Sequence, residues 1–151
     1  MKIAIGCDHA GINLKPALID YLKKNGYEYK DFGTYDKESC NYAEYGQKVA
    51  EAVAFGGYDR GILICGTGIG MSIVANKVPG IRCAHCHDHF SAVATRKHND
   101  ANVIAFGERV IGTGVMLEIV EAFLTTEFEE GRHVARLAKI TEVEGKYSNK
   151  K

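Results

Sequence analysis

One stretch of the chain, residues 61–77, joins an apolar run to a glycine-rich loop and then to a helical pattern. The apolar run ends in Cys65, and glycines follow at the alternate positions 66, 68 and 70. A buried strand that enters a helix through such a loop presents backbone N–H groups that bind anions. We therefore expect an anion or oxyanion site, although a tight turn that needs glycine for packing would show the same pattern.

Cys65 stands at the carboxyl end of the expected strand, beside this loop. Cysteine is commonly a buried core residue, but a thiol next to a helix N-terminus ionises more readily. The residue alone leaves two interpretations open, a core thiol or a nucleophile or base. Thr67 adds a hydroxyl that either caps the turn or transfers a proton. The loop lacks the Gly-x-Gly-x-x-Gly and Gly-Lys-Ser/Thr patterns, which disfavours nucleotide binding.

Apolar strand patterns alternate with helical patterns along the whole chain. The expected strands cover residues 2–7, 28–33, 60–65, 81–86 and 102–106. Helices follow them, the first capped by Asn13, and a last helix begins at Arg132 and frays over residues 146–151. Such alternation is typical of a parallel sheet covered on both faces. We predict one α/β domain over residues 1–151, a three-layer Rossmann-like sandwich with a five-stranded parallel sheet plus a C-terminal helix.

Composition excludes several classes of function. The chain has 151 residues, and its 19 basic and 19 acidic residues cancel, which argues against binding to nucleic acid or to a membrane surface. No apolar run approaches the length of a membrane span, and the apolar stretch at the N-terminus is too short for a signal peptide. We therefore expect a cytoplasmic protein with reduced cysteines.

Polar residues follow several of the expected strands, at the edge of a parallel sheet where ligands bind. Asp8 and His9 follow the first strand, His87 follows the fourth, and Arg109 comes soon after the fifth. Histidine and aspartate there would supply acid–base groups at neutral pH. The sequence thus predicts a site built from these residues and the Cys65 loop.

Four further candidates lie in helices. Arg132 and Arg136 are four residues apart and share a helix face, as a solvated stripe or as a phosphate clamp. His98 and Asn99 end another helix, where such residues are common caps, but His98 would also serve as an acid or base.

The run of residues 83–89 holds two cysteines and three histidines. A closed zinc site needs a second pair of ligands at a suitable spacing, and none follows. Strand alternation also sends Cys83 and His85 to one face and Cys86 to the other. We predict neither a metal nor a cofactor.

A thiol, an amide-rich loop, two histidines and three arginines together suit proton transfer beside the carbonyl of a small phosphorylated substrate. A base removes a proton, the loop amides stabilise an enediolate oxygen, and cations hold the phosphate. At this point the chain resembles the type B ribose-5-phosphate isomerases, in a wider group that includes galactose-6-phosphate isomerase subunits. The resemblance covers nearly the whole chain and rests on residues 5–11, 66–70 with 75–77, and 96–102 with 107–109.

The resemblance implies a cofactor-free interconversion of ribose 5-phosphate and ribulose 5-phosphate in the pentose phosphate pathway. It implies that Cys65 carries the proton between C1 and C2, that Thr67 assists at the substrate oxygens, and that His98, with Asp8 nearby, opens the sugar ring. It also implies that Gly66–Gly70 bind the enediolate and that His9, Arg132 and Arg136 hold the phosphate. The implied substrate-binding residues are Asp8, His9, Tyr42, Gly66, Thr67, Gly68, Ile69, Gly70, Asn99, Arg109, Arg132 and Arg136.

Related enzymes form dimers or tetramers with the site at a subunit interface, so the resemblance implies a homodimer or homotetramer. One branch of the family replaces the cysteine by a glutamate just after the loop, where this chain has Met71. The chain departs from the usual Tyr-Pro before the second helix, since Ala43 follows Tyr42. Two alternatives stay open: an isomerase of allose or galactose 6-phosphate, and a non-catalytic sugar-phosphate-binding subunit.

Overall fold

A computed structural model describes residues 1–148 of the chain. Its elements are, in order, β1 (Lys2–Cys7), α1 (Lys15–Lys24), β2 (Glu28–Asp31), α2 (Tyr42–Phe55), β3 (Arg60–Cys65), α3 (Ile69–Ala75), β4 (Cys83–His85), α4 (His89–Asn99), β5 (Val103–Gly107), α5 (Thr113–Thr125) and α6 (Arg132–Ser148). The five strands form one sheet in the order β2-β1-β3-β5-β4, and every pairing is parallel. The predicted five-stranded parallel sheet is confirmed.

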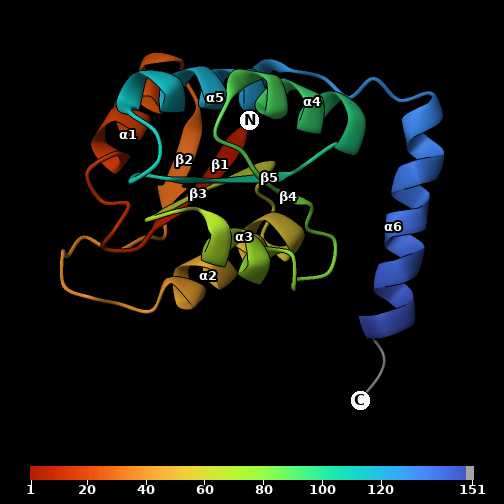
Figure 1. Cartoon of the computed structure of the whole chain (residues 1–151), viewed down its shortest axis with the longest axis horizontal. Helices are drawn as coiled ribbons and strands as arrows, with labels where there is room; N and C mark the ends of the chain where they lie inside the picture. Colours follow the sequence, from red (N-terminus) through yellow and green to blue (C-terminus); the bar gives the residue numbers. More distant parts are fainter. Residues whose placement is uncertain (149–151) are drawn as a thin grey trace.

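Helices cover both faces of this sheet, as predicted (Figure 1). One core packs α1, α4 and α5 against the sheet and includes Leu18 and Phe123, neither of which is exposed to solvent. The other packs α2 and α3 against the opposite face and includes Val49 and Met71. The central strands β1, β3 and β5 are almost wholly buried, because apolar side chains on both of their faces meet a helix layer.

The first helix begins one residue later than a cap at Asn13 predicts, and the Asn13 side chain does not cap it. The backbone N–H groups at its start have a distant partner instead. The Glu108 carboxylate accepts hydrogen bonds from the N–H groups of Asn13, at 2.8 Å, and Leu14, at 3.1 Å. An anion suits a helix N-terminus because the amides there carry partial positive charge. Glu108 therefore ties the turn after β5 to the start of α1.

Two strands and one helix are shorter than predicted. The edge strand β2 stops at Asp31 and alternates exposed and half-buried residues, unlike the continuous apolar run expected. The other edge strand, β4, has only three residues, and α3 ends at Ala75. The side chain of Asn76 then hydrogen-bonds both backbone groups of Cys83, at 2.8 and 2.9 Å, and joins the end of α3 to β4.

The C-terminal helix α6 stands apart from the three layers (Figure 1). It contacts α4, and its Glu144 carboxylate accepts a hydrogen bond from the Gly80 N–H at 3.0 Å. It remains helical to Ser148, so the predicted fraying is wrong for residues 146–148, and residues 149–151 lie outside the described part of the chain. Apolar residues of α6 are left exposed, among them Val134, Ile140 and Val143. Within residues 1–148, no helix has the length and apolar character needed to cross a membrane.

The turn before α6 holds a non-glycine residue in the left-handed region, Glu130, with φ 57°. This conformation costs a side-chain-bearing residue about 1 kcal/mol or more, and the Glu130 side chain is exposed. We expect Glu130→Gly to raise the free energy of unfolding by about 0.5–1 kcal/mol, measured by urea denaturation. The neighbouring variant Glu127→Gly, at a residue without positive φ, should give no gain; a loss of stability in Glu130→Gly would contradict the interpretation.

Candidate active site

A cavity of about 470 Å³ opens at the carboxyl ends of β1 and β3. It combines the loop after β1, the glycine loop after β3, the start of α2 and the turn after β5. Nine predicted site residues line it: Asp8, His9, Tyr42, Cys65, Gly66, Thr67, Ile69, Gly70 and Arg109. Residues that are far apart in sequence meet here because parallel strands present their carboxyl ends at one edge of the sheet.

Cys65 is the last residue of the buried strand β3, and only 5% of its surface is exposed. Its Sγ accepts a hydrogen bond from the backbone N–H of Gly68 at 3.0 Å. Cys65 also lines the cavity, so its thiol lies beside an amide donor at a place open to a ligand. The geometry thus favours chemistry over a purely structural thiol.

The glycine loop packs tightly against β5. Gly68 has φ +79°, and a Cβ there would lie 2.8 Å from the Phe106 backbone. A Cβ on Gly107 would lie 2.6 Å from the backbone of Thr67. Glycine is required for packing at both positions, so the tight-turn interpretation of the loop holds alongside any role in binding oxyanions. The Thr67 hydroxyl accepts the Ile69 N–H at 3.3 Å, as a turn cap would.

Asp8 and Arg109 are the oppositely charged residues that line this cavity. Asp8 is buried, and burial raises the pKa of its carboxyl above the ordinary value; hydrogen bonding to the Ala10 N–H, at 2.9 Å, and the charges of His9 and Arg109 oppose the rise. Arg109 is anchored by its own N–H, which donates to the Gly66 carbonyl at 3.1 Å. A buried carboxyl with a raised pKa, placed in a cavity, is a typical acid–base group.

His9 has its tautomer set by a residue that the sequence analysis missed. Its Nδ1 accepts a hydrogen bond from the backbone N–H of Cys40 at 3.3 Å, and the Cys40 Sγ lies 3.6 Å from the same nitrogen. The ring proton of neutral His9 is therefore on Nε2, where it is available to donate to an anion. Only the structure reveals this contact, because Cys40 lies in an irregular loop 31 residues away.

Tyr42 opens α2 and lies over the glycine loop. A Cβ on Gly70 would come within 2.6 Å of the Tyr42 ring, so glycine at that position makes room for the ring. Asn41 caps the helix in front of it, with its side chain accepting the Ala43 N–H at 3.1 Å. The departure from the usual Tyr-Pro thus leaves Tyr42 on the cavity wall.

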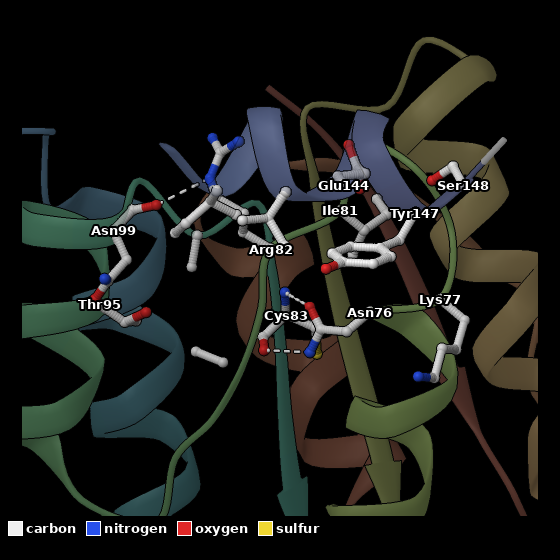
Figure 2. Close-up of a pocket in the computed structure, with 14 residues that line it drawn as sticks. Asn76, Lys77, Ile81, Arg82, Cys83, Thr95, Asn99, Glu144, Tyr147 and Ser148 are labelled. Carbon is white, nitrogen blue, oxygen red and sulfur yellow. Dashed lines mark hydrogen bonds between the residues drawn. The ribbon is translucent and has the colours of Figure 1, made fainter. Parts of the chain in front are cut away.

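Five predicted site residues are not among those that line this cavity in the described chain: Gly68, whose N–H points at the Cys65 sulfur, and four residues of the helices. His98 lies at the end of α4, where its ring stacks on that of His133, with the ring centroids 4.6 Å apart. Arg132 and Arg136 lie in the first turns of α6. Asn99 lines a separate groove of about 670 Å³ between α6 and β4, and its backbone carbonyl accepts a hydrogen bond from Arg82 Nε at 2.9 Å (Figure 2).

Metal binding can be judged from the donor chemistry. Burial raises the pKa of the Cys83 thiol, and that of Cys86 to about 11, so both remain protonated and poor ligands. Within residues 1–148, the ligand atoms of His98, Glu129 and His133 lie within 4.8 Å of one another. The carboxylate of Glu129 is already paired with the Lys97 ammonium at 3.1 Å, and the nearby arginines of α6 would repel a dication.

Acid should destabilise the fold through His133. Burial lowers the pKa of this imidazole below its ordinary 6.5, and the nearby Arg132 and Arg136 lower it further. The unfolded chain then binds the proton more readily, so stability present above pH 6.5 is lost as pH falls toward the folded-state pKa. Urea midpoints measured between about pH 7.5 and about pH 5.5 should fall. The fall should be smaller in His133→Gln and unchanged in the exposed-site control His89→Gln; an unchanged slope in His133→Gln would contradict this.

Comparison with known proteins places these features in a family. A model of the ribose/galactose isomerase family matches residues 3–140. The chain is 53% identical to a putative sugar phosphate isomerase of Bacillus subtilis, over 97% of this chain and 99% of that one. It is 49% identical to ribose-5-phosphate isomerase B of Escherichia coli, over 95% and 96%. The solved structure of Clostridium thermocellum ribose-5-phosphate isomerase B superposes with a TM-score of 0.95, at 57% identity, and covers 97% of this chain and 99% of that one.

Proposed function

The chain belongs to the ribose/galactose isomerase family, and on that basis we propose that it is an aldose–ketose isomerase that interconverts ribose 5-phosphate and ribulose 5-phosphate. The observation that carries the proposal is the cavity in which the Cys65 sulfur, the Asp8 carboxyl and the Arg109 guanidinium converge. The names of its relatives in Escherichia coli and Clostridium thermocellum support the five-carbon substrate.

In this proposal, the Cys65 thiolate removes the proton from C2 of the open-chain aldose. The C2–H bond breaks, its electron pair forms the C1–C2 double bond, and the carbonyl oxygen becomes the enediolate oxygen. The thiol returns the proton to C1, while the Thr67 hydroxyl moves the other proton from the oxygen on C2 to the oxygen on C1. Donors of the Gly66–Gly70 loop stabilise the enediolate. Of these, the Gly68 amide donates to Cys65 in the free protein.

The phosphate end of the substrate would need cations beyond those of one cavity. His9 offers its Nε2–H, but Arg132 and Arg136, which suit bidentate phosphate binding, are carried by α6 away from the Cys65 loop. His98, the group proposed to open the ring, also lies outside it. We therefore infer that a second subunit supplies these groups, in a homodimer or a tetramer built from such dimers.

The exposed surface of α6 supports this inference. Val134, Ile140 and Val143 are each about half exposed, at 51%, 47% and 46%, on a helix that stands apart from the body of the chain. An amphipathic helix gains little stability while its apolar side chains face water. A two-fold dimer would bury these residues in both subunits at once.

Mixing of inactive variants tests the shared site. Cys65→Ala and the double variant Arg132→Ala/Arg136→Ala should each be nearly inactive at low substrate concentration. Unfolded together and refolded, they should recover about a quarter of wild-type activity, because half of the dimers are mixed and each mixed dimer has one intact site. Cys65→Ala refolded with Asp8→Asn should recover none, since both residues line the same cavity. No recovery with the arginine variant would show that each site lies within one subunit.

A second candidate, an isomerase of galactose or allose 6-phosphate, is kept because the family description includes galactose. Rates on five- and six-carbon aldose phosphates decide between the two. We expect a higher kcat/KM for ribose 5-phosphate; a higher value for a hexose phosphate would overturn the substrate assignment. Binding of ribose 5-phosphate without turnover would instead support the remaining alternative, a non-catalytic sugar-phosphate-binding subunit.

A further inference from the structure

The peptide unit between Thr67 and Gly68 is held from both sides. Its N–H, contributed by Gly68, donates to the Cys65 Sγ at 3.0 Å. Its carbonyl, contributed by Thr67, lies 2.7 Å from the Nε2 of His85. Because a carbonyl only accepts, His85 donates this hydrogen bond and carries its proton on Nε2. The peptide bond is trans, so the two groups point in opposite directions, one toward each partner.

A second histidine, His87, follows Cys86 in the sequence and contacts the end of β5, against which the glycine loop packs. The Nε2 of His87 accepts the backbone N–H of Gly107 at 3.1 Å, which puts the proton of its neutral ring on Nδ1. Its imidazole also interacts with the backbone of Thr67. The rings of His85 and His87 pack edge to face, with centroids 4.5 Å apart. The two histidines thus link the glycine loop to the end of β5.

We propose that His85 and His87 are positioning residues that act through the Thr67–Gly68 peptide and aim its N–H at the Cys65 sulfur, so that the thiolate is stabilised. The proposal deepens the isomerase function, since it gives a reason for the sulfur to be ready as a base. Neither histidine lines the cavity, and neither needs to touch substrate. In the sequence, His85 appeared only as a metal-ligand candidate, whereas His87 also stood among the polar residues at the strand ends.

The physical argument has two parts. Gly68 has φ +79° and no Cβ, so the loop backbone has fewer steric restraints of its own at this residue. An imidazole that holds the carbonyl restricts rotation of the peptide plane. A hydrogen bond accepted by a carbonyl also polarises the N–H of the same peptide, which strengthens its bond to a charged acceptor.

The test follows the ionisation of Cys65 without relying on enzyme activity. Iodoacetamide alkylation of Cys65 is measured against pH by mass spectrometry of the peptide that contains it, which separates it from the other four cysteines. His85→Leu removes the donor, and His85→Gln keeps an amide donor near the position of Nε2. His89→Gln is the matched control, an exposed histidine at the start of α4. Asp8, His9, Tyr42 and Arg109, the charged or titratable groups that line the cavity beside Cys65, are unchanged in all three.

We expect the midpoint of the alkylation profile to move up by about one pH unit in His85→Leu, as when a hydrogen bond to a charged group loses its alignment. His85→Gln should restore most of the shift, and His89→Gln should match the wild type. In the isomerase assay, kcat of His85→Leu should fall about tenfold while KM stays within about twofold. An unchanged alkylation midpoint in His85→Leu would overturn the proposal.

A check of folding and a comparison of alkylation with turnover separate the remaining outcomes of the test. Far-ultraviolet circular dichroism tests whether His85→Leu is folded, and if it is not, His87→Leu, which loses the acceptor for the Gly107 N–H, is measured in the same way. A shifted midpoint in a protein that turns over no sugar phosphate would support the positioning role and refute the isomerase function. If the wild type is an active isomerase but the alkylation midpoint of His85→Leu is unshifted, the isomerase function stands and the positioning role is refuted.

Discussion

Cys65→Ala is expected to reduce isomerisation of ribose 5-phosphate by about a thousandfold or more, because general base catalysis alone contributes about 10²–10⁴-fold. The variant should fail to exchange the C2 proton with tritiated water at a measurable rate. No other cysteine lines the cavity, so within the described chain no second thiol can replace the lost base. The fold should tolerate the change, since alanine removes one small side chain at the end of a buried strand.

A binding measurement distinguishes the loss of the catalytic base from the loss of the substrate-binding site. The proposed phosphate contacts of His9, Arg132 and Arg136 do not involve the sulfur, so calorimetric titration of Cys65→Ala with ribose 5-phosphate should give a dissociation constant close to the wild-type KM. Cys83→Ala, which removes a half-buried thiol outside the cavity, is the control and should exchange the C2 proton at the wild-type rate. Exchange at the wild-type rate in Cys65→Ala would remove the thiol from the mechanism.

Lys15→Met is expected to lower the free energy of unfolding by about 3–5 kcal/mol. The Lys15 ammonium is 2.9 Å from an Asp31 carboxylate oxygen, and the two side chains are only 7% and 6% exposed. It also donates to the backbone carbonyl of Thr34. Methionine fills most of the same volume but leaves a buried carboxylate without its counter-charge, and the cost of an unpaired buried charge exceeds that of losing the pair.

A second variant isolates the charge effect. Adding Asp31→Asn to Lys15→Met removes the orphaned charge while it keeps an oxygen for the Gly33 N–H, which donates to Asp31 at 2.8 Å. The double variant should recover more than half of the lost free energy of unfolding. The remainder is the hydrogen bond from Lys15 to the Thr34 carbonyl, which methionine cannot replace. Lys24→Met, at the exposed end of the same helix, should change stability by no more than about 0.5 kcal/mol. Equal effects of Lys15→Met and Lys24→Met in urea denaturation would contradict the argument.

Sequence reasoning missed several residues that shape the site, for a common reason. Cys40 orients His9, Glu108 caps α1, and His85, the last residue of β4, holds the glycine loop. Each acts on a residue at least 18 positions away, and no local periodicity encodes such a contact. The one available signal was for Glu108, which sits in the 107–109 motif, but its target could not be inferred from spacing.

The sequence by itself determined the class of fold and the position of the glycine loop within it. Alternating apolar and amphipathic segments reflect local burial, so the five parallel strands and the helix layers on both faces were predictable. The glycine pattern likewise predicted a loop that follows Cys65 at the end of a strand. Only the tertiary structure decided the strand order, the buried Lys15–Asp31 pair and the separation of His98 from the Cys65 cavity. These depend on which distant surfaces pack together, a balance of many weak contacts that no short stretch of residues contains.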